Sequence, residues 1–204
     1  MTAYLSAPAT SRGPALILRP WSEADAADLV EAYRDDALRH WTTSAVDDEA
    51  GAARWIREQQ QGRETRNRYA FAVLEPRGPE DAEGAEGAEG PEGREGRDRL
   101  VGHVVVKGFR PGAPSAEVGY WTVAHARGRG VAPRALLALT DWAFTRFGDQ
   151  GPTRLELIHQ VDNTASCRVA RKCGFEQAGL LSPAPPAYPL EGHLHIRTRL
   201  PGAA

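Results

Sequence analysis

Short apolar runs alternate along the chain with longer stretches whose apolar residues recur at helical spacing. Runs bounded by Pro, Gly or Asp predict strands, and stretches that begin at a capping Ser, Asp or Asn predict helices. Together they predict an α/β sandwich with a mixed, mostly antiparallel sheet of about seven strands and about four helices. The expected strands are 16–19, 68–74, 100–108, 116–123, 154–159, 175–181 and 193–200, and the expected helices are 22–36, 47–60, 133–147 and 163–173.

Two segments depart from this pattern. Residues 1–14 have no clear periodicity, and we expect a flexible tail there. Residues 75–99 repeat Ala-Glu-Gly steps and carry almost no apolar side chain. Such a segment cannot bury enough surface to offset its ordering entropy, so we expect a disordered acidic loop inserted in one domain that spans residues 15–202.

The turn from Arg127 to Ala132, Arg-Gly-Arg-Gly-Val-Ala, lies between an expected strand and an expected helix. Gly128 and Gly130 allow a tight turn with exposed N–H groups, and the helix that follows directs its unpaired N–H groups and the positive end of its dipole to the same place. This arrangement is typical of phosphate binding. A P-loop would need Lys-Ser/Thr after the second glycine, and a dinucleotide fingerprint would need a third glycine where Pro133 stands.

The chain resembles the GCN5-related N-acetyltransferases (GNAT), in particular the branch of ribosomal-protein N-terminal acetyltransferases and their small-molecule relatives. The acetyl-CoA loop of that family reads Gln/Arg-x-x-Gly-x-Gly/Ala, which Arg127, Gly130 and Ala132 match. Residues 116–121 resemble the family's fourth strand, and residues 163–175 resemble its second cofactor helix and the strand after it. The resemblance covers roughly residues 15–200 and implies a GNAT fold with acetyl-CoA as the acyl-donor co-substrate.

An amine must lose a proton before it attacks a thioester, so an N-acetyltransferase needs a general base. Glu117 is the first candidate, because it lies mid-strand about ten residues before the loop, where relatives often place a glutamate. His159, at the end of the following strand, is the second, since imidazole titrates in the useful range. A carboxylate paired within the fold and an ordinary histidine at a strand end are the alternatives.

Backbone N–H groups of Trp121, Thr122 and Val123 are expected to hold the oxyanion. The resemblance implies that Ser166, three residues after the capping residue Asn163, meets the CoA sulfur, because Ala170 stands where other branches carry a tyrosine. The phosphates are expected at the phosphate turn, with charge from its two arginines. The residues expected to bind the cofactor are Trp121, Thr122, Val123, Arg127, Gly128, Arg129, Gly130, Val131, Ala132, Asn163 and Ser166.

Trp41 and Tyr188 are expected to line the acceptor site, Trp41 from a loop between the first two helices and Tyr188 from the proline-rich segment 182–189. The resemblance implies a primary amine as acceptor, either a protein N-terminus or a small molecule, and the narrowing residues favour the small molecule slightly. A non-catalytic acyl-CoA-binding or regulatory module and a transferase for a longer acyl group remain as alternatives.

Composition limits the partners. The 204 residues carry a formal charge of −2, which argues against nucleic acid. Segment 75–99 holds nine of the 27 acidic and four of the 25 basic residues, so the remainder is slightly basic, which suits an anionic cofactor. No stretch reads as a secretory signal or membrane span. Cys167 and Cys173 are expected to be free thiols in a reducing cytoplasm. We expect no metal, and a homodimer is left open.

Overall fold

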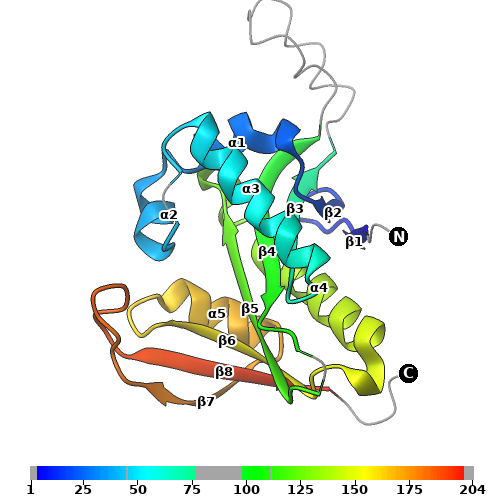
Figure 1. The fold of residues 1–204 in the computed structure, drawn as a ribbon, viewed down its shortest axis with the longest axis vertical. Helices are drawn as coiled ribbons and strands as arrows, with labels where there is room; N and C mark the ends of the chain where they lie inside the picture. Colours follow the sequence, from blue (N-terminus) through cyan, green and yellow to red (C-terminus); the bar gives the residue numbers. More distant parts are fainter. Residues whose placement is uncertain (1–3, 45, 77–97, 111, 200–204) are drawn as a thin grey trace, which may run out of the picture.

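The computed structural model describes residues 4–44, 46–76, 98–110 and 112–199, and its centre is one eight-stranded sheet (Figure 1). The strand order is β1-β2-β3-β4-β5-β6-β8-β7. The strands are β1 (Leu5–Ala7), β2 (Leu16–Pro20), β3 (Arg68–Glu75), β4 (Arg99–Lys107), β5 (Ser115–Thr122), β6 (Arg154–Gln160), β7 (Glu176–Leu181) and β8 (Gly192–Thr198). The α-helices are α1 (Ala26–Ala32), α2 (Asp36–Trp41), α3 (Glu49–Glu64), α4 (Val131–Phe147) and α5 (Thr164–Lys172).

The helices cover both faces of the sheet. Successive strand residues point to opposite faces. On one face, Trp55 of α3 contacts His103 of β4, and on the other, Trp142 of α4 contacts Phe71 of β3. The predicted fold class is therefore confirmed, with eight strands in place of about seven. No helix in the described part of the chain is long and apolar enough to cross a bilayer.

The strands β5 and β6 are the only parallel neighbours in this sheet, and they are paired along only part of their length. Their register joins Ser115 to Arg154 and ends with Val118 opposite Leu157. Beyond that point β5 continues to Thr122 beside β4 alone, and β6 continues to Gln160 beside β8 alone. The two strands therefore diverge toward their carboxyl ends, and Figure 1 shows them opening as a V.

Three boundaries differ from the sequence-based expectation. The flexible tail expected for residues 1–14 contains β1, because Leu5–Ala7 pairs with Leu16–Leu18 of β2. The helix expected over 22–36 ends at Ala32, because Asp35 caps a new helix by accepting a hydrogen bond from Ala37 N–H. Trp41, expected in a loop, is the last residue of that helix, α2.

The expected disordered segment 75–99 begins and ends in paired strands. Glu75 is the last residue of β3 and lies opposite Arg99, the first residue of β4. Residues 77–97, which make up most of the segment, lie outside the described residues, so the expectation of disorder stays a prediction.

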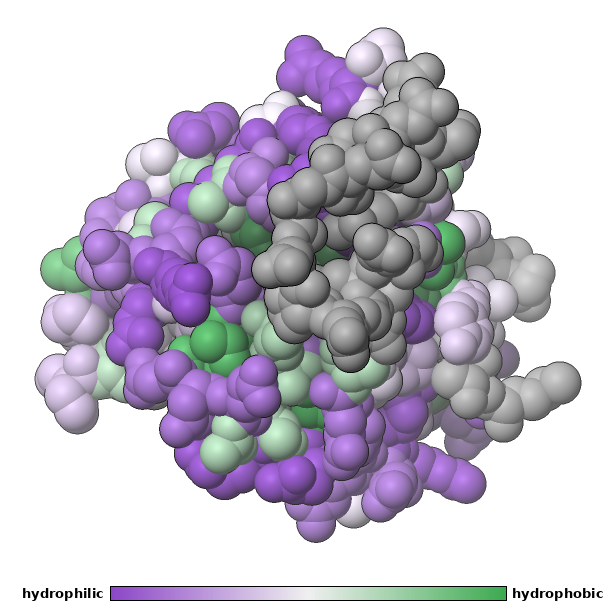
Figure 2. All heavy atoms as spheres, turned by 90° about the horizontal axis from the view of Figure 1, so that it is seen from above, coloured by the Kyte–Doolittle hydropathy of each residue, from purple (hydrophilic) through white to green (hydrophobic). Residues whose placement is uncertain are grey.

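An aromatic cluster fills the core beneath the carboxyl end of β5. Trp121 packs against Trp21, Tyr33 and His103, with ring centroids 5.4 to 6.1 Å apart. His103 Nδ1 accepts a hydrogen bond of 3.0 Å from Trp21 Nε1, and burial lowers the pKa of His103 to about 3. This histidine is therefore neutral at physiological pH and acts as a hydrogen-bonded core residue. Viewed from above, hydrophobic residues appear on the surface as separate patches among hydrophilic ones (Figure 2).

Candidate active site

The phosphate turn lies at the carboxyl end of β5, where the strand passes into α4. Gly128 and Gly130 have φ of 77° and 78°, in the left-handed region that glycine adopts without strain. Gly130 is the N-cap of α4, which begins at Val131. The first N–H groups of an α-helix have no partner within the helix, so the start of α4 offers N–H donors and positive dipole to an anion.

Both arginines of the turn are already paired with carboxylates. Arg129 makes two hydrogen bonds, of 2.9 and 2.8 Å, to Glu75, whose side chain is only 7% exposed. Arg127 forms an ion pair with Asp35, the residue that caps α2. The positive charge of each arginine is therefore partly neutralised by a carboxylate of the protein. Sequence reasoning missed both carboxylates, because Asp35 and Glu75 are far from the turn along the chain.

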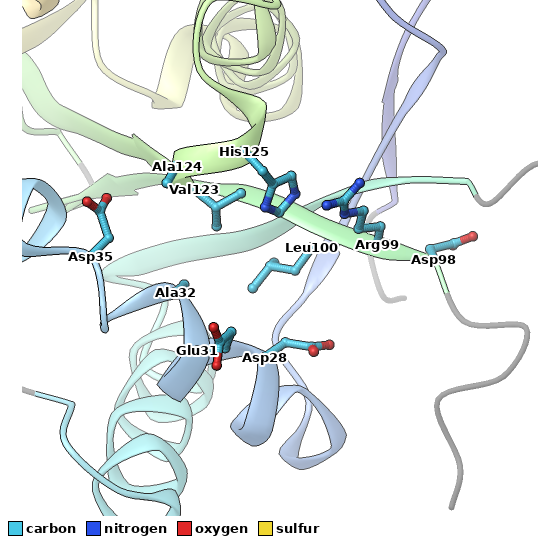
Figure 3. Close-up of a pocket in the computed structure, with 10 residues that line it drawn as sticks. All are labelled: Asp28, Glu31, Ala32, Asp35, Asp98, Arg99, Leu100, Val123, Ala124 and His125. Atoms are coloured by element: carbon cyan, nitrogen blue, oxygen red, sulfur yellow. The ribbon is translucent and has the colours of Figure 1, made fainter. Parts of the chain in front are cut away.

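A cavity of about 390 Å³ lies between α1 and residues 123–125, just before this turn (Figure 3). Asp28, Glu31 and Asp35 line one wall, and Arg99 and His125 line the other. Burial and the neighbouring Arg99 and Arg129 lower the pKa of His125, so this imidazole is neutral near pH 7. The wall of α1 is acidic, and an anionic phosphate is therefore better placed at the helix start than in this cavity.

The diverging strands bring Ser166 next to Tyr120. Asn163 caps α5 as predicted, and its side-chain oxygen accepts a hydrogen bond of 3.0 Å from Ser166 N–H. Ser166 Oγ lies 2.8 Å from the hydroxyl of Tyr120, on the part of β5 beyond the parallel pairing. Burial raises the pKa of Tyr120 to about 12, so the phenol keeps its proton at neutral pH and can act as a donor.

Tyr120 is therefore a candidate that the sequence analysis missed. Other branches of the family carry a tyrosine at the position of Ala170, and its absence from this sequence shifted the proton-donor role toward Ser166. The hydroxyl instead comes from β5, and only the alternation of side chains along that strand could have indicated that Tyr120 faces α5.

Glu117 forms a cross-strand ion pair with Lys107 of β4, with 2.8 Å between Lys107 Nζ and Glu117 Oε1. Both side chains are a little more than one-third exposed. Glu117 lies one residue before the last paired residue of β5, Val118, and three positions before Tyr120, which is roughly 10 Å along a strand. The carboxylate therefore lies near the point of the V and is open to water.

Of the three residues expected to form an oxyanion hole, only one directs its N–H group toward the opening. Val123 N–H donates a hydrogen bond of 3.2 Å to Val101 O of β4. Because N–H groups of successive strand residues point to opposite edges, that of Trp121 also points toward β4, and that of Thr122 points toward β6. Gly102 allows β4 to lie close to this part of β5, since a Cβ at position 102 would lie only 2.6 Å from Trp121 O.

His159 is less accessible than a general base requires. It is 9% exposed, its Nδ1 lies 2.8 Å from Gln160 O, and its Nε2 lies 3.2 Å from His195 Nε2. Both ring nitrogens therefore face polar partners within the protein, and burial lowers the pKa of His159.

The two expected acceptor residues come from opposite sides of the opening. Trp41 ends α2 and is 41% exposed, and Tyr188 is 50% exposed in the connection between β7 and β8. Figure 1 shows α2 on one side of the V and this connection on the other. Hydrogen bonds of 2.8 and 3.0 Å between Ala184 and Tyr188 fold the connection back on itself.

Comparison with known proteins identifies the class to which this fold and site belong. A family model described as an acetyltransferase (GNAT) domain matches residues 15–176. The chain therefore belongs to the GNAT family of acetyltransferases, and the expected family is confirmed. Among curated protein sequences, none matches the chain significantly.

Solved structures of acetyltransferases share the fold. RimJ of Mycobacterium smegmatis in complex with CoA-disulfide is 20% identical, with a TM-score of 0.73 over 98% of this chain and 88% of that one. The Salmonella typhimurium enzyme that modifies the N-terminal serine of ribosomal protein L7/L12 is 17% identical, with a TM-score of 0.70 over 91% and 95%. The microcin C7 self-immunity acetyltransferase MccE, in complex with acetyl-CoA and AMP, is 16% identical, with a TM-score of 0.70 over 93% and 98%.

The pair formed by Arg129 and Glu75 generates a prediction about stability. Arg129→Ala removes both hydrogen bonds from a buried carboxylate, and we expect it to lower the free energy of unfolding by about 1–3 kcal/mol. Arg34→Ala is the matched control, because Arg34, just after α1, forms an exposed ion pair with Glu31, and such a pair contributes at most about 1 kcal/mol. Urea denaturation measures both, and an equal cost for the two variants would contradict the prediction.

Proposed function

We propose that this chain transfers the acetyl group of acetyl-CoA to a primary amine by direct attack of the amine on the thioester. The observation that carries the proposal is the glycine turn at the start of α4, which lies where β5 and β6 have diverged in a GNAT domain. A diphosphate at the turn and a pantetheine arm between the two strands would bring the thioester close to Tyr120 and Ser166. RimJ and MccE, which share the fold, have been solved with CoA-disulfide and acetyl-CoA.

In this proposal the main-chain amides from Gly128 to Ala132 hold the diphosphate. Arg127 and Arg129 add charge to the turn, although each already holds a carboxylate. Both hydrogen bonds from Arg129 to Glu75 come from Nη2, so other N–H groups of the guanidinium can donate charge-assisted hydrogen bonds to a phosphate without releasing Glu75.

We assign the chemical roles from the exposure of each group and from the proton or hydrogen bond that it can donate or accept. Glu117 acts as general base through water, because it is exposed and lies near the point of the V. The Thr122 N–H group stabilises the oxyanion, since it points toward the opening. Ser166 gives its proton to the leaving thiolate and recovers one from Tyr120. Solvent returns a proton to Tyr120, whose raised pKa favours the protonated phenol, and accepts the proton that Glu117 has taken from the amine. His159 ranks below Glu117 as a base because both its nitrogens face partners.

We propose a small primary amine as acceptor rather than a protein N-terminus. Trp41 and Tyr188 narrow the two sides of the opening, and the hydrogen bonds between Ala184 and Tyr188 stiffen the second side. A peptide acceptor needs an open groove for its extended backbone, whereas a small amine needs a closed site. A longer acyl donor and a non-catalytic CoA-binding module are the competing functions.

Cofactor binding is tested at the turn. Gly130→Glu should abolish acetyl-CoA binding, because it adds a negative charge where phosphate is expected and strains a residue with φ of 78°. Gly130→Asn is the matched control, since asparagine tolerates the left-handed conformation and adds no charge. Isothermal titration calorimetry should detect binding to the wild type and to Gly130→Asn. No binding of CoA or acetyl-CoA by the wild type at millimolar concentration would exclude the proposed function.

Catalysis is tested at Glu117 and Ser166. Glu117→Gln should lower kcat by about 10²–10⁴-fold with little change in acetyl-CoA affinity, because only proton transfer is lost. Ser166→Ala should also slow turnover, and Tyr120→Phe should lower it less. Lys107→Met is the control for a structural role, because it breaks the same ion pair and leaves the carboxylate. Wild-type rates in both Glu117→Gln and Ser166→Ala, with a true acceptor, would refute these assignments and favour His159.

The acceptor is tested by measuring thiol release from acetyl-CoA against a panel of small amines, amino acids, aminoglycosides and N-terminal peptides. We expect turnover with one of the small amines and none with the peptides. The same panel with longer acyl-CoA donors tests the choice of acyl group. Turnover restricted to ribosomal-type peptides would overturn the choice of acceptor and leave the acetyl-transfer chemistry intact.

A further inference from the structure

A second group of reactive side chains lies beside the proposed active site. It consists of His159 of β6, Cys167 of α5, and His193 and His195 of β8. One nitrogen or sulfur atom of each residue lies within 4.8 Å of the corresponding atom of every other. The sequence analysis expected no metal and read Cys167 as a free thiol, because these four residues are not grouped along the chain.

The fold explains how they meet. His159 lies directly opposite His193 across the antiparallel pair of β6 and β8, so both side chains point to the same face of the sheet. His195 is two residues further along β8 and shares that face. Cys167, in the first turns of α5, lies above them, with its sulfur 3.2 Å from His193 Nδ1 and 3.8 Å from His195 Nε2.

Three of the six distances between the four ligand atoms lie close to those around a tetrahedral ion, and all six are within 4.8 Å. Zn²⁺ binds nitrogen at about 2.0–2.1 Å and sulfur at about 2.3 Å, which places two nitrogens about 3.3 Å apart and nitrogen and sulfur about 3.6 Å apart. His159 Nε2 and His195 Nε2 lie 3.2 Å apart, and the two sulfur contacts are 3.2 and 3.8 Å. Hydrogen bonds would explain the 3.2 Å contacts between His159 and His195 and between Cys167 and His193. They would not require the sulfur of Cys167 to approach His195 as well.

The protonation of His159 favours the same conclusion. Its Nδ1 faces the carbonyl oxygen of Gln160 at 2.8 Å, and a carbonyl can only accept, so Nδ1 carries the hydrogen. Nε2 therefore directs a lone pair into the cluster. A backbone hydrogen bond to the second nitrogen is how proteins orient a metal-bound histidine.

We propose that His159, Cys167, His193 and His195 form a binding site for Zn²⁺ that fastens the start of α5 to the strands β6 and β8. Three imidazoles and one thiolate are a donor set that suits zinc and complete a four-coordinate site. Cys167 releases its proton to solvent when the metal binds. His193 and Cys167 are only partly buried and offer a path of entry, whereas His195 is fully buried.

Zinc binding by this cluster does not depend on the proposed acetyl transfer. The two sites are nevertheless adjacent, because Cys167 follows Ser166 directly in α5. A bound ion would occupy His159 Nε2 and prevent this residue from acting as a general base. It would also hold the turn that presents Ser166 to Tyr120.

The test uses untagged protein stripped of metal with a chelator and titrated with Zn²⁺ in the absence of acetyl-CoA. Calorimetry in buffers of different ionisation enthalpy should show one equivalent bound, with release of a proton, and Zn²⁺ should raise Tm. Co²⁺ should give a thiolate-to-metal charge-transfer band and the intense visible absorption of tetrahedral cobalt. Failure of the untagged protein to bind one equivalent of Zn²⁺ would overturn the proposal, whatever its activity.

Variants decide whether these four residues are the ligands. Cys167→Ser and His193→Ala should weaken Zn²⁺ binding by on the order of a hundredfold or more and abolish the charge-transfer band. Both positions are only partly buried, and circular dichroism checks that the variants fold. Cys173→Ser and His40→Ala are the matched controls, because they remove a thiol and an imidazole outside the cluster. Equal Zn²⁺ affinity in all four variants would show that the cluster is held by hydrogen bonds alone.

Discussion

The parallel pairing of β5 and β6 ends at Val118 and Leu157, and the rest of the site depends on this limit. Main-chain groups that leave a sheet must find other partners or face solvent or a ligand. Here each strand keeps a neighbour on its outer side, β4 for β5 and β8 for β6, so the two can separate without losing their order. The inner edges then carry N–H and C=O groups that are rigidly placed. A slot with such walls is well suited to an extended, amide-containing chain such as pantetheine.

Residues packed on both faces of the sheet hold the elements of the proposed site in place. Beneath Trp121, the cluster with Trp21, Tyr33 and the neutral His103 fixes the carboxyl end of β5. On the other face, Asn163 sets the start of α5 and thereby the position of Ser166. Functional groups positioned by packed elements stay close to one geometry, which is the condition for electrostatic stabilisation of a transition state. The groups around the proposed thioester position are therefore held by packed strands and helices, whereas the phosphate turn and the connection between β7 and β8 are loops.

Sequence patterns predicted the elements whose signals are local. The glycine turn, the cap at Asn163 and seven of the eight strands were predicted, because glycine spacing, capping residues and alternation act within a few residues. The partners of the arginines could not be predicted, since Glu75 lies 54 residues from Arg129 and Asp35 lies 92 residues from Arg127. The cluster around Cys167 was missed for the same reason: its members come from three elements that meet only in the folded sheet. The predicted end of the first helix was wrong because Asp35 caps a new helix within a longer helical pattern.

The ion pair between Arg127 and Asp35 joins the glycine turn before α4 to the cap of α2. Arg127 belongs to the turn that we propose binds the donor, and Asp35 caps the short helix that carries Trp41 on the proposed acceptor side. A ligand that draws on Arg127 changes the charge at that cap, and a ligand that shifts α2 changes the freedom of Arg127. Equilibrium thermodynamics makes such an influence equal in both directions, so in the proposed site this one contact would link the affinities for donor and acceptor. An enzyme with such a link can sense through its own surface whether the first substrate is present before it engages the second.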